Sequence, residues 1–133
     1  MNFKIYVIGD KIEKFYLEGI KEYEKRLSRS CKIQLHHFKN LESLSKKLSD
    51  KTYKIVISSK GNTISSEELA DKINLLGVTG KSDVSLLIGA DSIPHDEVLS
   101  ISPMEMDLGL KTTIIFEQIY RAYRILNNEP YHK

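Results

Sequence analysis

Short apolar segments typical of β-strands alternate along this chain with longer segments whose apolar residues recur at helical spacing. Strands are predicted over residues 3–9, 32–38, 53–57 and 84–89, and helices over residues 12–27, 41–48, 65–76 and 110–126. Ser65 and Glu68 have the spacing of a capping box and mark the start of the third helix. Strands that alternate with helices are joined by right-handed crossovers into a parallel sheet. We therefore predict an α/β fold, a parallel sheet flanked by helices, with residues 1–133 as one domain.

The ends of the predicted strands limit where a site can lie. The strand over residues 84–89 is nearly all apolar, as is typical of a central strand that is buried on both faces. A parallel sheet binds its ligands beyond the carboxyl ends of its strands. Residues 58–62 are predicted as a turn, and Pro94 and Pro103 mark residues 90–107 as irregular. Residues 58–62 and 89–107 are therefore the expected walls of a site.

Composition and motifs argue against several functions. The 20 Lys and Arg against 18 Asp and Glu give a net charge of +2, which neither requires nor excludes a nucleic-acid partner. No segment approaches the roughly 20 apolar residues that span a bilayer, so we expect a cytoplasmic protein without a membrane partner. The chain has no glycine motif for a dinucleotide and no P-loop, which argues against NAD and ATP chemistry.

Metal and thiol chemistry are not expected either. His36 and His37 are neighbours on a strand and point to opposite faces, so they do not suit one metal ion, and we predict no metal site. Cys31 is the single cysteine, which excludes an internal disulfide and a cysteine-rich zinc site. We expect its thiol to be buried and inert.

The last predicted helix carries arginines beside tyrosines. Arg121 and Arg124 stand close in sequence to Tyr120, Tyr123 and Tyr131. Such pairs suit phosphate contact and base stacking, and they are equally typical of the solvated face of an amphipathic helix. The helix also has apolar or aromatic residues on more than one side, which fits either a dimer interface or a helix buried within its own domain. The tail over residues 127–133 is expected either to fray or to present its aromatic ring and imidazole to a partner.

Several motifs occur together in one order along the chain. They are Gly9-Asp10-Lys11, Glu22-Tyr23-Glu24-Lys25-Arg26-Leu27, Lys60-Gly61 with Ser65-Ser66-Glu67, Leu86-Leu87-Ile88-Gly89, Glu117-Gln118-Ile119-Tyr120-Arg121-Ala122-Tyr123 and Pro130-Tyr131-His132-Lys133. With them the chain resembles, over nearly its whole length, the RlmH family of S-adenosylmethionine-dependent methyltransferases of large-subunit ribosomal RNA. The resemblance implies the SPOUT fold with a C-terminal trefoil knot, and a homodimer whose active site lies at the interface. It also implies methylation of a ring nitrogen of a pseudouridine in the assembled ribosome.

The resemblance further implies roles for individual residues. Those implied to bind S-adenosylmethionine are Ile57, Gly89, Ala90, Ser102, Pro103, Met104, Glu105, Met106 and Asp107. Arg121, Tyr131 and His132 are implied as the catalytic residues that position the nucleotide. The ring nitrogen must lose a proton during the transfer, and the imidazoles that remain to accept it are His132, which we favour, and His95.

Departures from the family pattern leave other functions open. Ala90 stands where the family has a second glycine, and Asp107, Leu108 and Thr112 stand where it has a Pro-His pair and a later arginine. The alternative function is a protein that binds RNA, ribosomes or another partner without methyl transfer. A third possibility is methyl transfer to a different RNA, such as transfer RNA.

Overall fold

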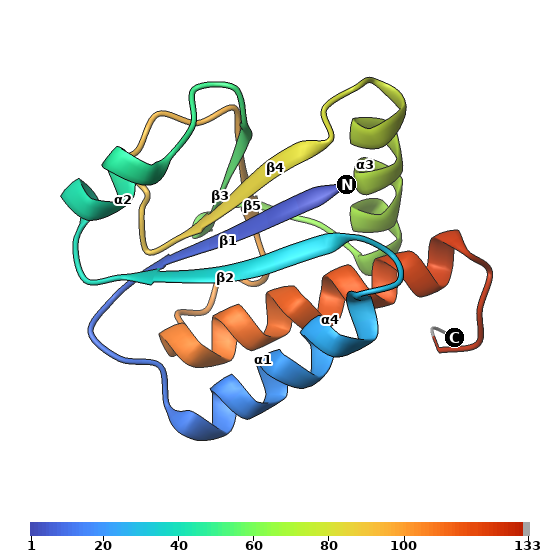
Figure 1. Ribbon diagram of the computed structural model, residues 1–133, viewed down its shortest axis with the longest axis horizontal. Helices are drawn as coiled ribbons and strands as arrows, with labels where there is room; N and C mark the ends of the chain where they lie inside the picture. Colours follow the sequence, from blue (N-terminus) through green and yellow to red (C-terminus); the bar gives the residue numbers. More distant parts are fainter. Residues whose placement is uncertain (132–133) are drawn as a thin grey trace.

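The computed structural model describes residues 1–131 and contains five strands and four helices in that range (Figure 1). In chain order they are β1 (Asn2–Ile8), α1 (Lys14–Leu27), β2 (Lys32–Phe38), α2 (Leu41–Lys47), β3 (Tyr53–Thr63), α3 (Ser66–Val78), β4 (Asp83–Ile88), β5 (Glu97–Ser100) and α4 (Leu108–Leu126). The predicted capping box is confirmed at the start of α3, because the side chains of Ser65 and Glu68 each accept a hydrogen bond from the other residue's backbone N–H. Among the described residues, no helix is long and apolar enough to cross a membrane.

The sheet is parallel throughout and has the strand order β2-β1-β4-β3-β5. Ile5 in β1 lies between Leu35 in β2 and Leu86 in β4. The predicted α/β fold is confirmed, and so is the central place of the apolar strand β4. Because every strand points the same way, the carboxyl ends of β1, β3 and β4 meet at one edge of the sheet.

Helices cover both faces of the sheet, unequally. On one face α1, α3 and α4 pack against alternate residues of β1, with Ile20, Ile73 and Phe116 among the buried side chains. On the other face the short helix α2 contributes Leu44 to a smaller core that contains Tyr6. This unequal cover follows from the period-two alternation of side chains along a strand, which sends successive residues to opposite faces.

The structure corrects the sequence prediction on one side of the sheet. Residues 58–62, predicted as a turn, continue β3 as far as Thr63, with a shift in register against β5 after Ile57. The predicted irregular stretch 90–107 contains β5. Gly61 has the character of a turn residue in the sequence, but a Cβ there would lie 2.7 Å from Val98 Cγ1. Glycine is therefore needed because β5 packs closely against this extension.

Helix α4 runs antiparallel to β1, from the carboxyl edge of the sheet to its amino edge. It begins at Leu108, two residues before the predicted start, where Asp107 caps it by accepting from the N–H groups of Gly109 (2.9 Å) and Leu110 (3.3 Å). Near this end the side chain of Leu108 lies against Gly9, and near the other end the Tyr123 ring meets Phe3 at 6.5 Å between centroids. The helix therefore spans the whole sheet.

The chain turns back after α4 as far as Tyr131. Asn128 adopts a left-handed conformation (φ 57°), and the N–H of Glu129 donates to the carbonyl of Arg124 (2.8 Å). The guanidinium of Arg124 in turn donates to the carboxylate of Glu129 (2.8 Å) and to the carbonyl of Pro130 (3.3 Å). The expectation of a frayed tail is thus wrong for residues 127–131. His132, the predicted proton acceptor, lies outside the described residues.

Candidate functional site

Three segments meet at the carboxyl edge of the sheet through side-chain hydrogen bonds. The hydroxyl of Ser58 in β3 donates to the carboxylate of Asp91, which follows β4 (2.8 Å). The neighbouring hydroxyl of Ser59 donates to the carboxylate of Glu105 in the loop between β5 and α4. The two walls that the sequence predicted, residues 58–62 and 89–107, are therefore in contact.

The loop over residues 101–107 is held partly by its own bonds. The hydroxyl of Ser100 donates to the carbonyl of Ser102 (2.8 Å), and the Ser102 hydroxyl accepts from the N–H of Met104 (3.1 Å). Met104 is 74% exposed at the outside of the loop, and Pro103 is exposed beside it. The predicted cofactor residues 102–107 thus form one ordered surface loop.

A small cleft lies under this loop. It is lined by Ile57, Ser58, Ser59, Ile101, Ser102, Met104, Met106 and Lys111 and has a volume of about 10 Å³. A cleft of that size holds no more than about one water molecule. A larger ligand therefore requires the loop to move outward, and the bond from Ser59 to Glu105 is one contact that such a movement would break.

Gly89 and Ala90 follow β4 at the same edge of the sheet. The backbone conformation at position 89 requires glycine, and the side chain of Ala90 is part of the core. Gly89 has φ +78°, and a Cβ there would lie 2.6 Å from the carbonyl oxygen of Ile8. Ala90 is 1% exposed and packs with Tyr6 and Leu87 on the far face of the sheet. Any contact that Ala90 makes with a ligand at the carboxyl edge is therefore through its backbone.

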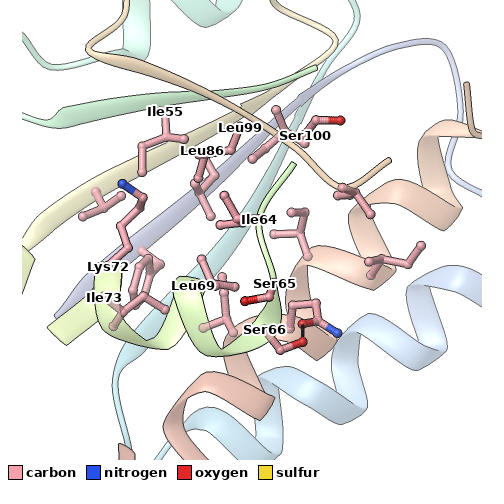
Figure 2. Close-up of a pocket in the computed structure, with 18 of the residues that line it drawn as sticks. Ile55, Ile64, Ser65, Ser66, Leu69, Lys72, Ile73, Leu86, Leu99 and Ser100 are labelled. Atoms are coloured by element: carbon pink, nitrogen blue, oxygen red, sulfur yellow. Dashed lines mark hydrogen bonds between the residues drawn. The ribbon is translucent and has the colours of Figure 1, made fainter. Parts of the chain in front are cut away.

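A much larger cavity lies next to the cleft, between the sheet and helices α3 and α4 (Figure 2). Its volume is about 300 Å³, and its walls are mainly apolar. Ile57 and Ile101 line both the cavity and the small cleft, so the two spaces are neighbours. Polar side chains from Ser65, Ser66 and Gln118 stand at one side, where the Ser66 hydroxyl donates to the Gln118 amide oxygen. The sequence analysis missed this cavity, because apolar helix faces do not reveal how far a helix stands from a sheet.

The arginine and tyrosine predicted as catalytic lie together at the other end of α4. The guanidinium of Arg121 lies 4.8 Å from the centroid of the Tyr131 ring and donates to the carboxylate of Glu117 (3.1 Å). The hydroxyl of Tyr131 donates to the same carboxylate (2.7 Å). Burial and this carboxylate raise the pKa of Tyr131, so its phenol stays protonated at neutral pH. Glu117 was not among the residues predicted to form the site.

Within one chain, the loop over residues 102–107 and the pair Arg121 and Tyr131 lie far apart. Asp107 and Arg121 lie 14 positions apart around a continuous helix, which places them about 21 Å apart along its axis at 1.5 Å per residue. The loop residues lie at the carboxyl edge of the sheet, whereas Tyr131 lies toward its amino edge. A site that uses both groups therefore takes them from two chains.

The structure also places Leu108, Thr112 and His95, which the sequence analysis singled out. Thr112 is fully buried and donates to the carbonyl of Leu108 (2.8 Å), and Leu108 packs against the core, so both residues serve the packing of α4. The Nδ1–H of His95 donates to the carbonyl of Ile93 (2.7 Å), and the next residue, Asp96, donates its backbone N–H to the carbonyl of Lys54 near the start of β3. His95 thus lies toward the amino edge of the sheet, away from the cleft of its own chain.

The remaining histidines and the cysteine have structural roles in the described residues. His36 stacks on Tyr6 at 5.1 Å between ring centroids, and His37 bonds through Nε2 to the carbonyl of Gly9 (2.7 Å). No cluster of three His, Cys, Asp or Glu suited to a metal ion occurs within residues 1–131. Burial raises the pKa of the Cys31 thiol to about 11, which suppresses the reactive thiolate.

Comparison with known proteins agrees with this architecture. A family model described as a predicted SPOUT methyltransferase matches residues 1–132. The match, the parallel sheet and the ordered loop at its carboxyl edge define a SPOUT-class methyltransferase.

The curated relatives narrow the class further. Ribosomal RNA large subunit methyltransferase H 1 of Thermoanaerobacter sp. (strain X514) is 57% identical over 133 residues, which cover 100% of both chains. The ribosomal RNA large subunit methyltransferases H of Clostridioides difficile (strain 630) and Acetivibrio thermocellus are 40% and 35% identical, over 159 aligned positions that cover 100% of both chains. This chain belongs to the RlmH family. Its 133 residues make it a short member, and the Thermoanaerobacter relative shares that shortening.

Proposed function

We propose that this protein transfers a methyl group from S-adenosylmethionine to large-subunit ribosomal RNA, at a ring nitrogen of a pseudouridine. The observation that carries the proposal is the contact of three segments at the carboxyl edge of the sheet, through the pairs Ser58–Asp91 and Ser59–Glu105. Parallel sheets bind their ligands at this edge. The relatives are named as methyltransferases of large-subunit ribosomal RNA, which supports that RNA as the class of substrate.

The residues around the small cleft fit S-adenosylmethionine in chemical character. Ile57 and Ile101 offer an apolar surface of the kind that a nucleobase needs, and Asp91 and Glu105 place two carboxylates at the rim. S-adenosylmethionine supplies a methyl group on a positively charged sulfonium, and a carboxylate attracts such a charge. Pro103, Met104, Met106 and the other loop residues from Ser102 to Asp107 hold the ligand mainly through backbone groups. The loop opens to admit it, since the closed cleft is too small.

The nucleotide is positioned from the other end of α4. Arg121 provides a cation for a phosphate or a carbonyl oxygen, and Tyr131 provides a protonated phenol and an aromatic face. We assign His132 to the acceptance of the proton from the ring nitrogen. Because α4 separates these residues from the loop of their own chain, the active form is a homodimer, in which the tail of one chain completes the loop of the other. The trefoil knot implied by the family remains a prediction. The reaction takes place in the cytoplasm, on the ribosome.

A first experiment separates this function from binding without catalysis. The purified protein is titrated calorimetrically with S-adenosylmethionine and then incubated with the methyl-labelled compound and ribosomes. We expect saturable binding and label in the large-subunit RNA. Transfer RNA in a parallel reaction tests the other RNA substrate. A folded dimer that binds no S-adenosylmethionine would refute the proposed enzyme and favour the protein that binds without methyl transfer. The observation that favours this alternative is that Leu108 and Thr112 stand where the resemblance implies a histidine and an arginine.

The assignment of His132 has its own test. His132→Ala is expected to lower the turnover of methyl transfer more than it lowers the affinity for S-adenosylmethionine. His95→Ala is the matched control, because His95 lies toward the opposite edge of the sheet from the cleft. Equal turnover of His132→Ala and the parent would remove His132 from the mechanism.

A further inference from the structure

Three donors converge on one carboxylate in α4. The side chain of Glu117 accepts from the hydroxyl of Tyr131 (2.7 Å) and the guanidinium of Arg121 (3.1 Å) through Oε2, and from the amide of Gln118 (2.7 Å) through Oε1. Glu117 is only 19% exposed and Arg121 only 26%. A carboxylate that is largely withdrawn from water binds its donors more tightly than an exposed one does.

The same carboxylate connects the tail to the body of the protein. Gln118, which donates to Glu117, accepts from the hydroxyl of Ser66 at the start of α3. A continuous chain of hydrogen bonds therefore runs from α3 through Glu117 to Tyr131. The Tyr131 ring also packs edge-on against Tyr120, with 4.9 Å between centroids. These contacts hold the last described residue in one place relative to α4.

The other arginine–glutamate pair at helical spacing provides a comparison. Arg26 in α1 donates to Glu22 (2.8 Å), and both side chains are about half exposed. Arg26 also lies 5.7 Å from the Tyr120 ring centroid, close to the same aromatic cluster. Within the described residues the carboxylate of Glu22 accepts from Arg26 of its own helix, whereas the carboxylate of Glu117 accepts directly from Tyr131 in the tail. The two pairs are thus alike in sequence spacing and differ in whether they hold the tail.

We propose that Glu117 is a positioning residue for methyl transfer, which fixes the phenol of Tyr131 and the guanidinium of Arg121 as one unit. The inference rests on the proposed function. Without the carboxylate, the phenol loses its acceptor and the guanidinium its partner in α4, so both groups gain rotational freedom. A misplacement of this kind lowers turnover, since the reacting groups must be aligned before transfer.

The test is a double-mutant cycle between Glu117→Ala and Tyr131→Phe, read as methyl transfer to ribosomes. We expect each single variant to lower kcat by about tenfold, and the double variant also by about tenfold, because Glu117 acts through Tyr131. Glu117→Gln keeps an oxygen for the phenol and is expected to recover part of the activity. Glu22→Ala is the matched control and should leave kcat unchanged. The affinity for S-adenosylmethionine, measured by calorimetry, should change by less than about threefold in every variant.

A second measurement reports on Tyr131 itself. Burial and, after it, the bond to Glu117 raise the pKa of the phenol, so Glu117→Ala should remove the second cause and lower the Tyr131 pKa toward its ordinary value of 10.0, as followed by NMR of labelled tyrosine. Losses that multiply to about a hundredfold in the double variant, or an unchanged Tyr131 pKa, would overturn the role of Glu117. Absence of methyl transfer by the parent protein, in contrast, would overturn the proposed function together with this inference.

Discussion

Gly89 offers a test of whether a predicted cofactor residue is required by the backbone. Its φ of +78° lies in the left-handed region, where an L-residue with a Cβ costs about 1–2 kcal/mol. An alanine Cβ would also lie 2.6 Å from the carbonyl oxygen of Ile8. That oxygen belongs to the backbone at the end of β1, next to Gly9, whose N–H donates to Phe38 (3.0 Å). The clash therefore cannot be relieved by rotating a side chain.

The expected cost of Gly89→Ala is the sum of these two effects. Overpacking of a closely packed site costs about 1–3 kcal/mol, so the free energy of unfolding should fall by about 2–5 kcal/mol. Such a loss is a large part of the roughly 5–15 kcal/mol that stabilise a typical domain. Unfolding in urea, followed by circular dichroism, measures it directly.

Gly80 supplies the matched control for this prediction. It also has a left-handed φ of +82°, but a Cβ there would meet no atom within 4 Å. Gly80→Ala should therefore lose only the conformational contribution of about 1–2 kcal/mol. Equal losses in the two variants would show that the contact with Ile8 has no energetic effect, and the reasoning would be refuted. If both proteins fold, calorimetry with S-adenosylmethionine then separates the backbone role of Gly89 from a role in binding.

Four further predictions concern the thiol of Cys31 and two helix ends. Burial raises the pKa of the Cys31 thiol from the ordinary 9.0 to about 11, so the reactive thiolate is scarce at pH 8. The reaction of Cys31 with a disulfide reagent at pH 8 should therefore be about 100-fold slower than that of a free cysteine. The rate should rise as the pH approaches 11. The same difference predicts that stability is lost between pH 9 and 11, since the unfolded thiol ionises first. Ser65→Ala removes one half of the capping box and should lower the free energy of unfolding by about 1 kcal/mol in urea, whereas Ser28→Ala, which removes an exposed bond at a helix end, should cost less. Asp107→Ala removes the cap of α4 and should also cost about 1 kcal/mol; an unchanged urea midpoint would contradict the capping role.

The regular elements were predictable because their apolar residues keep the period of a strand or a helix. The prediction failed in β3 and β5, where the local sequence favours a turn or a loop and the pairing of neighbouring strands favours a strand. Ser58, Gly61 and Asn62 have the composition of a turn, yet they lie within β3, whose pairing with β5 is interrupted after Ile57 and resumes at Asn62 and Thr63. β5 has only four residues and follows Pro94, so its pattern is too short to separate from a loop. Its existence depends on the neighbour that it pairs with, which a local pattern does not contain.

The site was predictable in part for a topological reason. Parallel strands end at the same edge, so residues that follow β3 and β4 had to lie near one another, as the pair Ser58–Asp91 confirms. The contact between Tyr131 and Glu117 joins residues 14 positions apart through the left-handed turn at Asn128, and no local pattern predicts such a turn. The cavity of about 300 Å³ beside the cleft depends on the spacing between layers, which is equally absent from the sequence.

The two ends of helix α4 have different surroundings. Leu108 and Thr112 belong to the first turns, where Thr112 is fully buried and Leu108 packs against Gly9, so both side chains are part of the core. Arg121 belongs to the last turns, where its partners are Glu117 and the ring of Tyr131. The rigid helix keeps Arg121 about 21 Å along its axis from Asp107 in the loop of the same chain. In the proposed homodimer the tail of one chain acts at the loop of the other, so the residues that hold the tail on α4, Glu117 first among them, would set its position there.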